Sequence, residues 1–203
     1  MNERGMIFNA EMVRAILDGR KTQTRRPVKF PLIDKNMGCE LAGNELAGEL
    51  AAHNYWNSPY GKPGDRIWVR ETFRVHSRAT DVATLVYRAS VRNSWTEQTH
   101  RVPVAVCNTP ATPEKWTPSI HMPRWASRIL LEITDVGVER LRDLSEEDAK
   151  SEGITPPAGG VLPGWEYRIN FRDLWMDIYG TDSWEANPWV WVIEFKRVEG
   201  AAL

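Results

Sequence analysis

Two spacings of apolar residues recur along the chain, and each predicts a different kind of element. Near the start, Met12, Ala15 and Ile16 lie at helical spacing, which predicts a helix over Ala10 to Asp18 after a short strand over Met6 to Phe8. Asn9 belongs to the residue types that cap a helix N-terminus. Gly19 follows the stripe and is expected to end the helix in the left-handed conformation.

Alternating apolar and polar residues predict strands farther along the chain. These predicted strands are Arg66 to Arg74, Leu85 to Tyr87, Ala126 to Val138, and Trp189 to Val198, of which the third is either a strand pair or one long bent strand. Ser145, with Asp148 three residues later, predicts a capped helix that runs to about Ser151.

A second helical stripe contains Tyr167, Phe171, Leu174, Trp175 and Ile178, and Gly180 closes it. The strands are not separated by helices in a regular alternation. This order favours an α+β fold with a mostly antiparallel sheet.

Composition places the chain among ordinary globular proteins. Of the 203 residues, 42% are hydrophobic and 26% charged, the net charge is -1, and ten residues are Trp. Cys39 and Cys107 form no CxxC pair, and no apolar leader or run of about 20 apolar residues occurs. We therefore expect a cytoplasmic protein with reduced cysteines and no membrane association.

One segment departs from this balance. Residues 20–29 read RKTQTRRPVK and carry five cations without an acid, and Pro27 confines the segment to an edge or a strand end. A charge run of this kind is most often a solvated basic strand. Self-repulsion nevertheless destabilises it unless a polyanion or an acidic neighbour is present, which slightly favours a functional interpretation.

Four segments, in this order, resemble the ASCH family. Gly19, Lys21 and Arg26 fit its GxKxxxxR pattern, and the others are residues 63–69 (PGDRIWV), 144–153 (LSEEDAKSEG) and 189–195 (WVWVIEF). The resemblance implies a small PUA-like β-barrel with flanking helices, a single domain over residues 1–203, and a link to RNA. It leaves out residues 35–62 and 93–125, which we interpret as loop-rich insertions that lie outside the barrel.

A bacterial subgroup of that family deacetylates N4-acetylcytidine with a Lys, a Thr and a Glu. Residue by residue, these fall on Lys21, Thr24 and Glu152, and the resemblance implies Lys21 as the base, Thr24 as the nucleophile and Glu152 as the orienting or water-activating carboxylate. Amide hydrolysis needs a nucleophile and a proton acceptor, and a buried Lys whose pKa falls toward neutrality can be that acceptor. In a regular strand, however, Lys21 and Thr24 point to opposite faces, so convergence requires a bend or bulge. The alternative is a structural Lys21–Glu152 ion pair with Thr24 merely packed.

Substrate or nucleic-acid contacts are expected from arginines near the motif and from tryptophans beside arginines, since an exposed aromatic can stack on a base. These candidates are Arg20, Arg25, Arg26, Trp68, Arg70, Arg124 and Trp125. The four histidines stand singly, and no phosphate-binding glycine motif occurs, so we expect neither a metal nor an organic cofactor.

Three functions remain open on the sequence. The first is an amidohydrolase that acts on N4-acetylcytidine or a related modified nucleoside. The second is a non-catalytic module that binds RNA or single-stranded nucleic acid in the same cleft. The third is a ribonuclease, since a Lys-Thr-Glu-Arg cluster could also cleave a phosphodiester.

Overall fold

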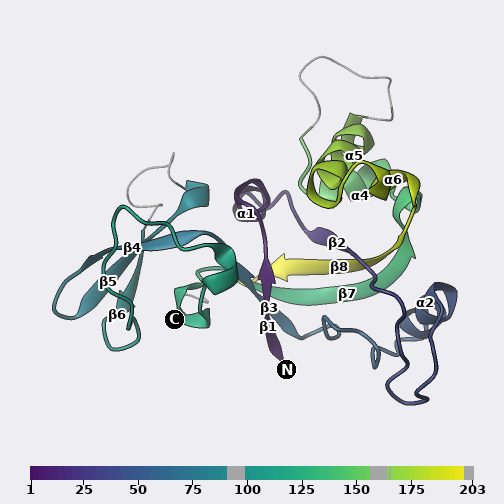
Figure 1. Ribbon diagram of the computed structural model, residues 1–203, viewed down its shortest axis with the longest axis horizontal. Helices are drawn as coiled ribbons and strands as arrows, with labels where there is room; N and C mark the ends of the chain where they lie inside the picture. Colours follow the sequence, from purple (N-terminus) through teal and green to yellow (C-terminus); the bar gives the residue numbers. More distant parts are fainter. Residues whose placement is uncertain (91–98, 156–163, 165, 199–203) are drawn as a thin grey trace. The chain divides into compact units, whose positions relative to one another are not determined.

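The computed structural model describes residues 1–90, 99–155, 164 and 166–198. It is a mixed α+β structure with two sheets, and the fold class expected from the sequence is confirmed at that level (Figure 1). The larger sheet has the strand order β1-β3-β7-β8-β2, and the smaller has the order β4-β5-β6. Strand β7, Leu130–Arg140, runs through both of the compact units into which the chain divides.

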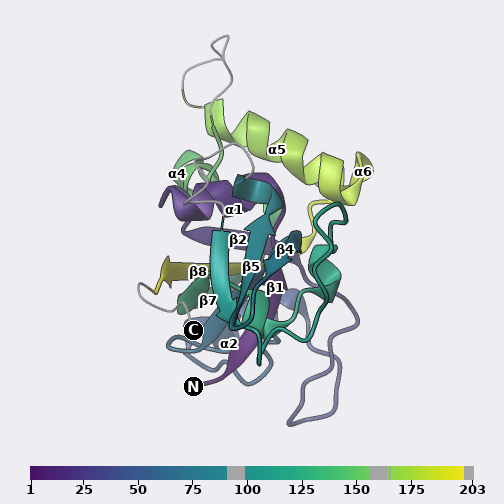
Figure 2. The ribbon, with the colours of Figure 1, turned by 90° about the vertical axis from the view of Figure 1, so that its left-hand side faces the viewer.

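The first unit comprises Met1–Asp18, Arg66–Glu132 and the chain from Arg197 onward. It holds β1 (Glu3–Ile7), α1 (Ala10–Leu17), β3 (Arg66–Arg70), β4 (Phe73–Arg78), β5 (Val82–Tyr87) and β6 (Thr99–Pro103). Strand β1 pairs with β3 in parallel, whereas β3–β7, β4–β5 and β5–β6 are antiparallel. Figure 2 shows the paired strands β4 and β5 side by side.

The start of the chain follows the sequence prediction closely. Asn9 Oδ1 accepts the backbone N–H of Met12 at 2.8 Å and so caps α1. Gly19 has φ of +73°, the left-handed conformation expected of it. The first strand begins earlier than expected, at Glu3 rather than Met6, because pairing with β3 defines it and not the apolar residues.

The second unit comprises Gly19–Asp65 and Ile133–Lys196. Its elements are β2 (Gln23–Pro27), α2 (Gly43–Ala51), α4 (Glu146–Ser151), α5 (Glu166–Tyr179), α6 (Asp182–Glu185) and β8 (Trp189–Arg197), together with most of β7. Helices α4, α5 and α6 gather into one group, and their core packs Phe171 and Trp175 against Leu141, Leu144 and Val190 (Figure 1).

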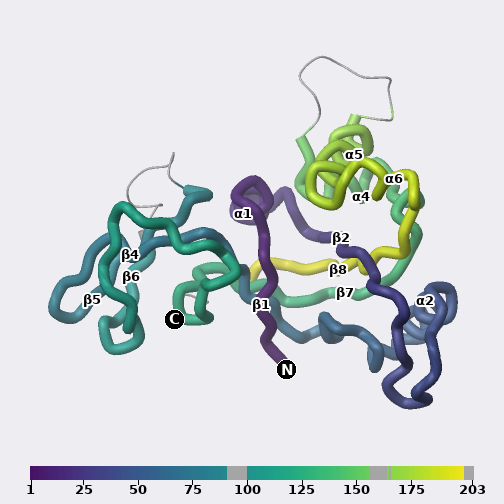
Figure 3. Tube along the Cα trace, viewed as in Figure 1, coloured from purple at the N-terminus to yellow at the C-terminus, as the bar shows by residue number. Residues whose placement is uncertain are grey.

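Both segments interpreted as loop-rich contain regular structure. Residues 35–62 include helix α2, which is labelled on the Cα trace in Figure 3. Gly43 begins this helix against the indole of Trp189, so closely that no Cβ would fit there. Within residues 93–125, of which 93–98 lie outside the described residues, β6 pairs with β5, and Val102, Cys107 and Met122 join the buried core of the first unit. That segment therefore supplies core side chains rather than only surface loop.

Other boundaries differ for identifiable reasons. The strand expected over Arg66 to Arg74 is two strands, β3 and β4, which separate at Glu71 and Thr72 and belong to different sheets. The strand expected from Ala126 begins at Leu130, because a 3-10 turn over Arg124–Ala126 precedes it. Pro27 ends β2, which is last in the order of its sheet, as the prediction of an edge or strand end required.

Candidate functional site

The basic segment lies on β2, where alternation sorts its side chains into two sets. Strand β2 pairs antiparallel with β8 without interruption, from Gln23 opposite Glu194 to Pro27 opposite Val190. Thr22 continues the same ladder, since its carbonyl accepts the N–H of Phe195 at 2.8 Å. Because the ladder is regular, Lys21, Gln23 and Arg25 share one face, and Thr22, Thr24 and Arg26 share the other.

Helix α4 brings its end to the first of these faces. Ser145 and Asp148 form the capping box that the sequence predicted, and Glu152 is the C-cap residue. Lys21 and Glu152 form a backbone bridge, and the N–H of Thr22 donates to the carbonyl of Ser151 at 2.8 Å. The end of α4 is thereby tied to the start of β2 through main-chain bonds, which fixes both side chains at the junction.

Lys21 and Glu152 form a buried ion pair. Lys21 Nζ donates to Glu152 Oε2 at 2.6 Å and to the carbonyl oxygen of Glu152 at 2.9 Å, and the two side chains are 0% and 4% exposed. Burial lowers the pKa of the Lys21 ammonium below its ordinary value. Glu152 opposes that shift, and Arg26 and Arg25 add to it. The pair therefore holds a lysine whose proton is easier to remove than that of a solvated lysine.

Arg25 joins this pair to two further acids. Its guanidinium contacts Glu152 Oε1 at 3.2 Å, Glu139 Oε1 at 2.7 Å and Asp148 Oδ1 at 3.5 Å. We call Lys21, Arg25, Glu139, Asp148 and Glu152 the charge cluster; it contains two cations and three carboxylates. Burial would lower the pKa of Arg25, but the carboxylates, Glu152 first, raise it, so this group stays ionised.

The other two acids of the charge cluster differ in environment. Burial raises the pKa of Glu139, and Arg25 opposes that shift. Burial also acts to raise the pKa of Asp148, but hydrogen bonds from Ser145 and Gln23, together with Arg25, lower it below its ordinary value. Gln23 Nε2 donates to the carbonyl oxygen of Asp148 at 2.8 Å and to its Oδ1 at 3.1 Å. Lys21, just before β2, and Gln23 and Arg25 on the strand thus all contact α4 or its C-cap residue Glu152, and Arg25 also contacts Glu139 of β7.

The structure brings Lys21 and Glu152 together but leaves Thr24 on the opposite face of β2. Thr24 is 1% exposed and lies opposite Ile193, a core residue of β8, so the two side chains share a face. No register shift occurs between Gln23 and Pro27 that would turn Thr24 toward the pair. The bend or bulge required for convergence is therefore not present in this strand.

A hollow of about 400 Å³ lies beside the buried pair. Its lining includes Arg20, Thr22, Glu147, Lys150, Ser151 and Tyr167. Thr22 directly follows Lys21 in the chain and Ser151 directly precedes Glu152, so the hollow adjoins the bridge that joins the pair. Arg20 donates from Nη1 to the carbonyl of Gly153 at 2.8 Å, which fixes that arginine at its edge.

The remaining sequence candidates are placed as follows. Arg26 is half-buried and lies opposite Trp191 on the face that Thr24 shares. The other four belong to the first unit, where Arg70 stacks on Trp68 at 5.4 Å and Arg124 donates to Glu3 Oε2 at 2.9 Å. Trp125 packs edge-on against Phe73 at the core of that unit. These four groups are thus engaged within their own unit.

Sequence reasoning missed a second buried ion pair, in the first unit. Glu71 is 2% exposed and accepts from Arg128 Nε at 2.9 Å and Nη2 at 3.1 Å, while Ser90 accepts a further bond from the same guanidinium. Burial raises the pKa of Glu71, and Arg128 opposes that shift. The available signal was the alternation of residues 66–74, which sets Glu71 on the buried face with Ile67 and Val69.

Among the described residues, no group of three or more His, Cys, Asp or Glu side chains could hold a metal ion. No helix in the described ranges is both long and apolar enough to cross a membrane. No protein-family model, curated protein or solved structure matches the chain.

Proposed function

We propose that the protein is an amidohydrolase that removes the acyl group from N4-acetylcytidine or a related modified nucleoside. Lys21 and Glu152 are its proton-transfer pair. The observation that supports this proposal is the buried contact of 2.6 Å between Lys21 Nζ and Glu152 Oε2, with burial lowering the pKa of the lysine. A lysine in this state releases its proton more readily than a solvated lysine and can take it back during the reaction.

The chemistry requires two protons to move, one between Lys21 and Glu152 and one from the attacking group to the leaving nitrogen. Transfer from Lys21 to Glu152 turns the ion pair into a neutral amine and acid, and burial makes this step easier because it disfavours the charged form of the lysine. The amine then removes a proton from the attacking group as it adds to the acyl carbon. The Lys21 ammonium then gives that proton to N4 as the carbon–nitrogen bond breaks, which yields cytidine and acetic acid. The acetic acid loses its proton to solvent, and Glu152 returns the first proton to Lys21.

The attacking group in this scheme is a water molecule. Thr24 was the expected nucleophile, but its side chain lies across β2 from Lys21. Arg25, held on the second oxygen of Glu152 at 3.2 Å, keeps that carboxylate oriented toward the lysine. Arg25 is therefore a positioning residue in this proposal rather than a substrate contact.

The adjoining hollow is the proposed substrate pocket. Its volume of about 400 Å³ is within the usual range for small-molecule sites, about 300–1,000 Å³. Tyr167 and the hydroxyl residues Thr22 and Ser151 offer stacking and hydrogen bonds to a nucleoside. Since Lys21 is fully covered, turnover requires the backbone bridge between Lys21 and Glu152 to open toward the hollow when substrate enters.

The charge cluster favours an enzyme over a nucleic-acid-binding module at this place. Nucleic-acid binding by the basic segment requires its cations to lack an acidic neighbour within the protein. Lys21 and Arg25 are neutralised by three carboxylates of the chain itself, so neither is available to phosphate. The ribonuclease alternative loses the same two cations, which would have stabilised the phosphate.

Membership of the ASCH family and a PUA-like barrel are part of the same proposal. The four family-like segments support it, since they supply β2, β3, α4 and β8. Barrel closure would further require β1 and β2, which stand at the two ends of the strand order, to be joined.

The test is incubation of purified protein with N4-acetylcytidine and, separately, with a short RNA, with all products identified by mass. Deacetylation is expected, and RNA cleavage is not. Lys21→Met and Glu152→Gln should each lower the rate about 100-fold or more, because a positioned acid–base group contributes about 10²–10⁴-fold. Lys21→Arg should be equally inactive, since arginine does not release a proton at working pH.

Lys29→Met is the matched control, because Lys29 is an exposed lysine just beyond β2. It should leave the rate unchanged. Circular dichroism of every variant separates loss of chemistry from loss of fold. Folded Lys21→Met protein with the parent's rate would show that the Lys21–Glu152 pair is only structural.

A further inference from the structure

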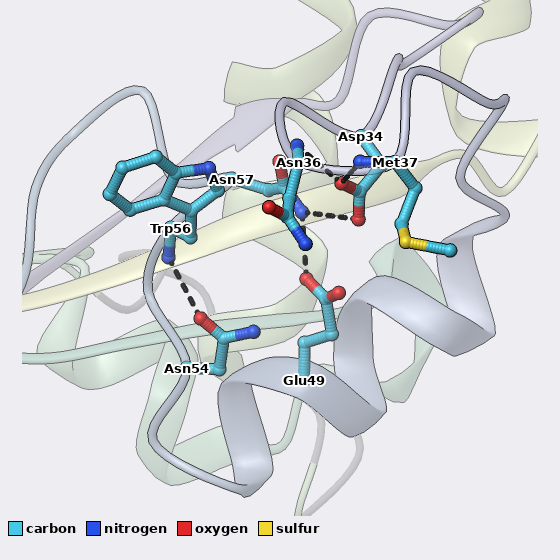
Figure 4. A pocket seen from close by; sticks show the side chains of 7 residues that line it. All are labelled: Asp34, Asn36, Met37, Glu49, Asn54, Trp56 and Asn57. Carbon is cyan, nitrogen blue, oxygen red and sulfur yellow. Dashed lines mark hydrogen bonds between the residues drawn. The ribbon is translucent and has the colours of Figure 1, made fainter.

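The loops on either side of α2 enclose a second pocket, on the segment that the family resemblance does not cover (Figure 4). Its volume is about 370 Å³. Five of its lining residues are polar, namely Asp34, Asn36, Glu49, Asn54 and Asn57, and the other two are Trp56 and Met37. It shares no lining residue with the hollow beside the charge cluster.

Two buried side chains make the floor of this pocket rigid. Asp34 Oδ1 accepts the backbone N–H groups of Asn36 and Met37, both at 2.7 Å. Asn57 Nδ2 donates to Asp34 Oδ2 at 3.1 Å and to Glu49 Oε2 at 2.9 Å (Figure 4). Asp34 and Asn57 are 7% and 3% exposed, so this framework exists before any ligand arrives.

The Trp56 indole forms an exposed flat surface of the pocket, and polar groups lie beside it. The Trp56 side chain belongs to a residue that is 64% exposed. The backbone N–H of Trp56 donates to Asn54 Oδ1 at 3.2 Å, and among the described residues the amide nitrogen of Asn54 keeps its capacity to donate. Within the described part of the chain, Glu49 Oε1 and the Asn36 carboxamide also keep hydrogen-bonding capacity, since the bonds around them use Glu49 Oε2 and the Asn36 backbone.

We propose that this pocket binds one nucleobase that carries an exocyclic amino group, stacked on Trp56. A planar ring gains stacking on the indole whatever its sequence context. A carboxylate oxygen accepts from an exocyclic amino group, and a side-chain amide donates to the neighbouring ring nitrogen or carbonyl, as in base-edge recognition. Cytosine, adenine and guanine present that amino group, and uracil does not.

The charges around the pocket agree with a base rather than a phosphate as the group that enters it. Asp34 and Glu49 repel an anion from the floor. Lys35 lies at the edge, where its Nζ donates to the carbonyl of Trp56 at 2.9 Å and places a cation beside that flat surface. A base can thus enter while its phosphate stays near Lys35. This binding goes beyond the proposed hydrolysis and does not depend on Lys21.

The test is calorimetric titration of the whole protein with cytidine, adenosine, guanosine and uridine, and with single-stranded tetranucleotides of each base. The three amino-bearing nucleosides should bind more tightly than uridine. Trp56→Ala should weaken binding about 5- to 150-fold, as expected for loss of one base–aromatic stack, whereas Trp56→Tyr should retain most of it. Glu49→Gln should bring the amino-bearing nucleosides close to uridine.

Two control variants keep this test separate from the hydrolase test. Phe30→Ala removes another exposed aromatic side chain of the same unit and should leave the affinities unchanged. Lys21→Met should bind nucleosides at the Trp56 pocket as the parent does, even where hydrolysis is lost. A tetranucleotide that binds more tightly than its nucleoside would identify a strand as the source of the base, and equal affinities would identify the free nucleoside.

Three results would overturn the proposal. The first is no binding of any nucleoside or tetranucleotide at millimolar concentration. The second is binding that Trp56→Ala leaves intact, with its melting temperature unchanged. The third is binding of neutral oligosaccharides, but of no nucleoside, through Trp56.

Discussion

Replacing Glu152 with Gln tests whether Lys21 is held as a buried cation. The substitution keeps the shape of the side chain and the backbone carbonyl that accepts Lys21 Nζ at 2.9 Å, but removes the carboxylate at 2.6 Å. Arg25 retains Glu139 and Asp148, so Lys21 is the only member of the charge cluster that loses every carboxylate it contacts there.

The magnitude follows from the two states open to the lysine. Breaking a buried pair by removing one partner costs about 3–5 kcal/mol. Releasing the proton at pH 7 instead costs about 4.6 kcal/mol for a lysine that ionises near 10.4 when unfolded. The free energy of unfolding should therefore fall by about 3–5 kcal/mol, a large part of the roughly 5–15 kcal/mol of a typical domain.

The loss should shrink as the pH rises. Burial lowers the pKa of Lys21, and in Glu152→Gln the opposing effect of Glu152 is absent. The folded variant then binds fewer protons than the unfolded chain, so its stability increases with pH up to the ordinary lysine value. Between pH 7 and pH 9 the deficit should decrease by at most about 1.4 kcal/mol per pH unit.

The assay is urea unfolding at pH 7 and pH 9, followed by tryptophan fluorescence and circular dichroism. The set is the parent, Glu152→Gln, Lys21→Met, the double variant and Lys29→Met. The loss of stability in the double variant should be smaller than the sum of the losses in the two single variants by about 0.5–3 kcal/mol, because the two residues are in contact. A deficit of Glu152→Gln below about 1 kcal/mol at pH 7, or one that grows between pH 7 and pH 9, would refute the buried cation.

Local geometry gives three further predictions, tested with four substitutions. Ser145→Ala removes the hydroxyl that accepts the Asp148 N–H at 3.1 Å and should cost about 0.5–2 kcal/mol, measured by thermal unfolding. Gly19→Ala should destabilise the protein by about 1–2 kcal/mol because Gly19 has a positive φ. Gly48→Ala, in open space on α2, should instead stabilise it by up to about 1 kcal/mol. Equal effects of the two substitutions would show that the positive φ of Gly19 is not the cause. The N–H groups of Met37 and Asn36 lower the pKa of Asp34, so the ionised carboxylate stabilises the fold above about pH 4 and this stabilisation is lost as the pH falls through the pKa of the folded state. Asp34→Asn should therefore make the free energy of unfolding less dependent on pH in the acid range. An unchanged pH dependence in Asp34→Asn would contradict this.

Periodicity predicted the elements that bury one face and missed those defined by their neighbours. The stripes around Ile16 and Trp175 appear as α1 and α5, because an apolar face needs a core to pack against. Helix α2 was missed since Gly43 and Gly48 suggested a loop, although Leu46 and Leu50 lie four residues apart and are buried. Strand β6 has little apolar alternation, and its pairing with β5 determines it.

The site could be predicted only where charge or motif carried the information. Complementary charges on β2 and α4 made the approach of Lys21 and Glu152 foreseeable, and the two residues meet. The contact between Glu139 and Arg25 could not be predicted, because the sequence around Glu139 gives no sign that a distant arginine packs against this strand position. The side-chain alternation that argued against Thr24 joining the pair holds in β2, where the ladder to β8 is regular.

The bridge between Lys21 and Glu152 joins positions 131 residues apart in the chain. Contacts of such long range form slowly, because the entropy of closing the intervening loop must be overcome before they contribute. During synthesis the basic segment would leave the ribosome long before α4 and β8 exist to cover it. Until then Lys21 and Arg25 are open cations on an unpaired strand, a state in which the nascent chain depends on solvent, or on other macromolecules, for the counter-charges that it later supplies itself.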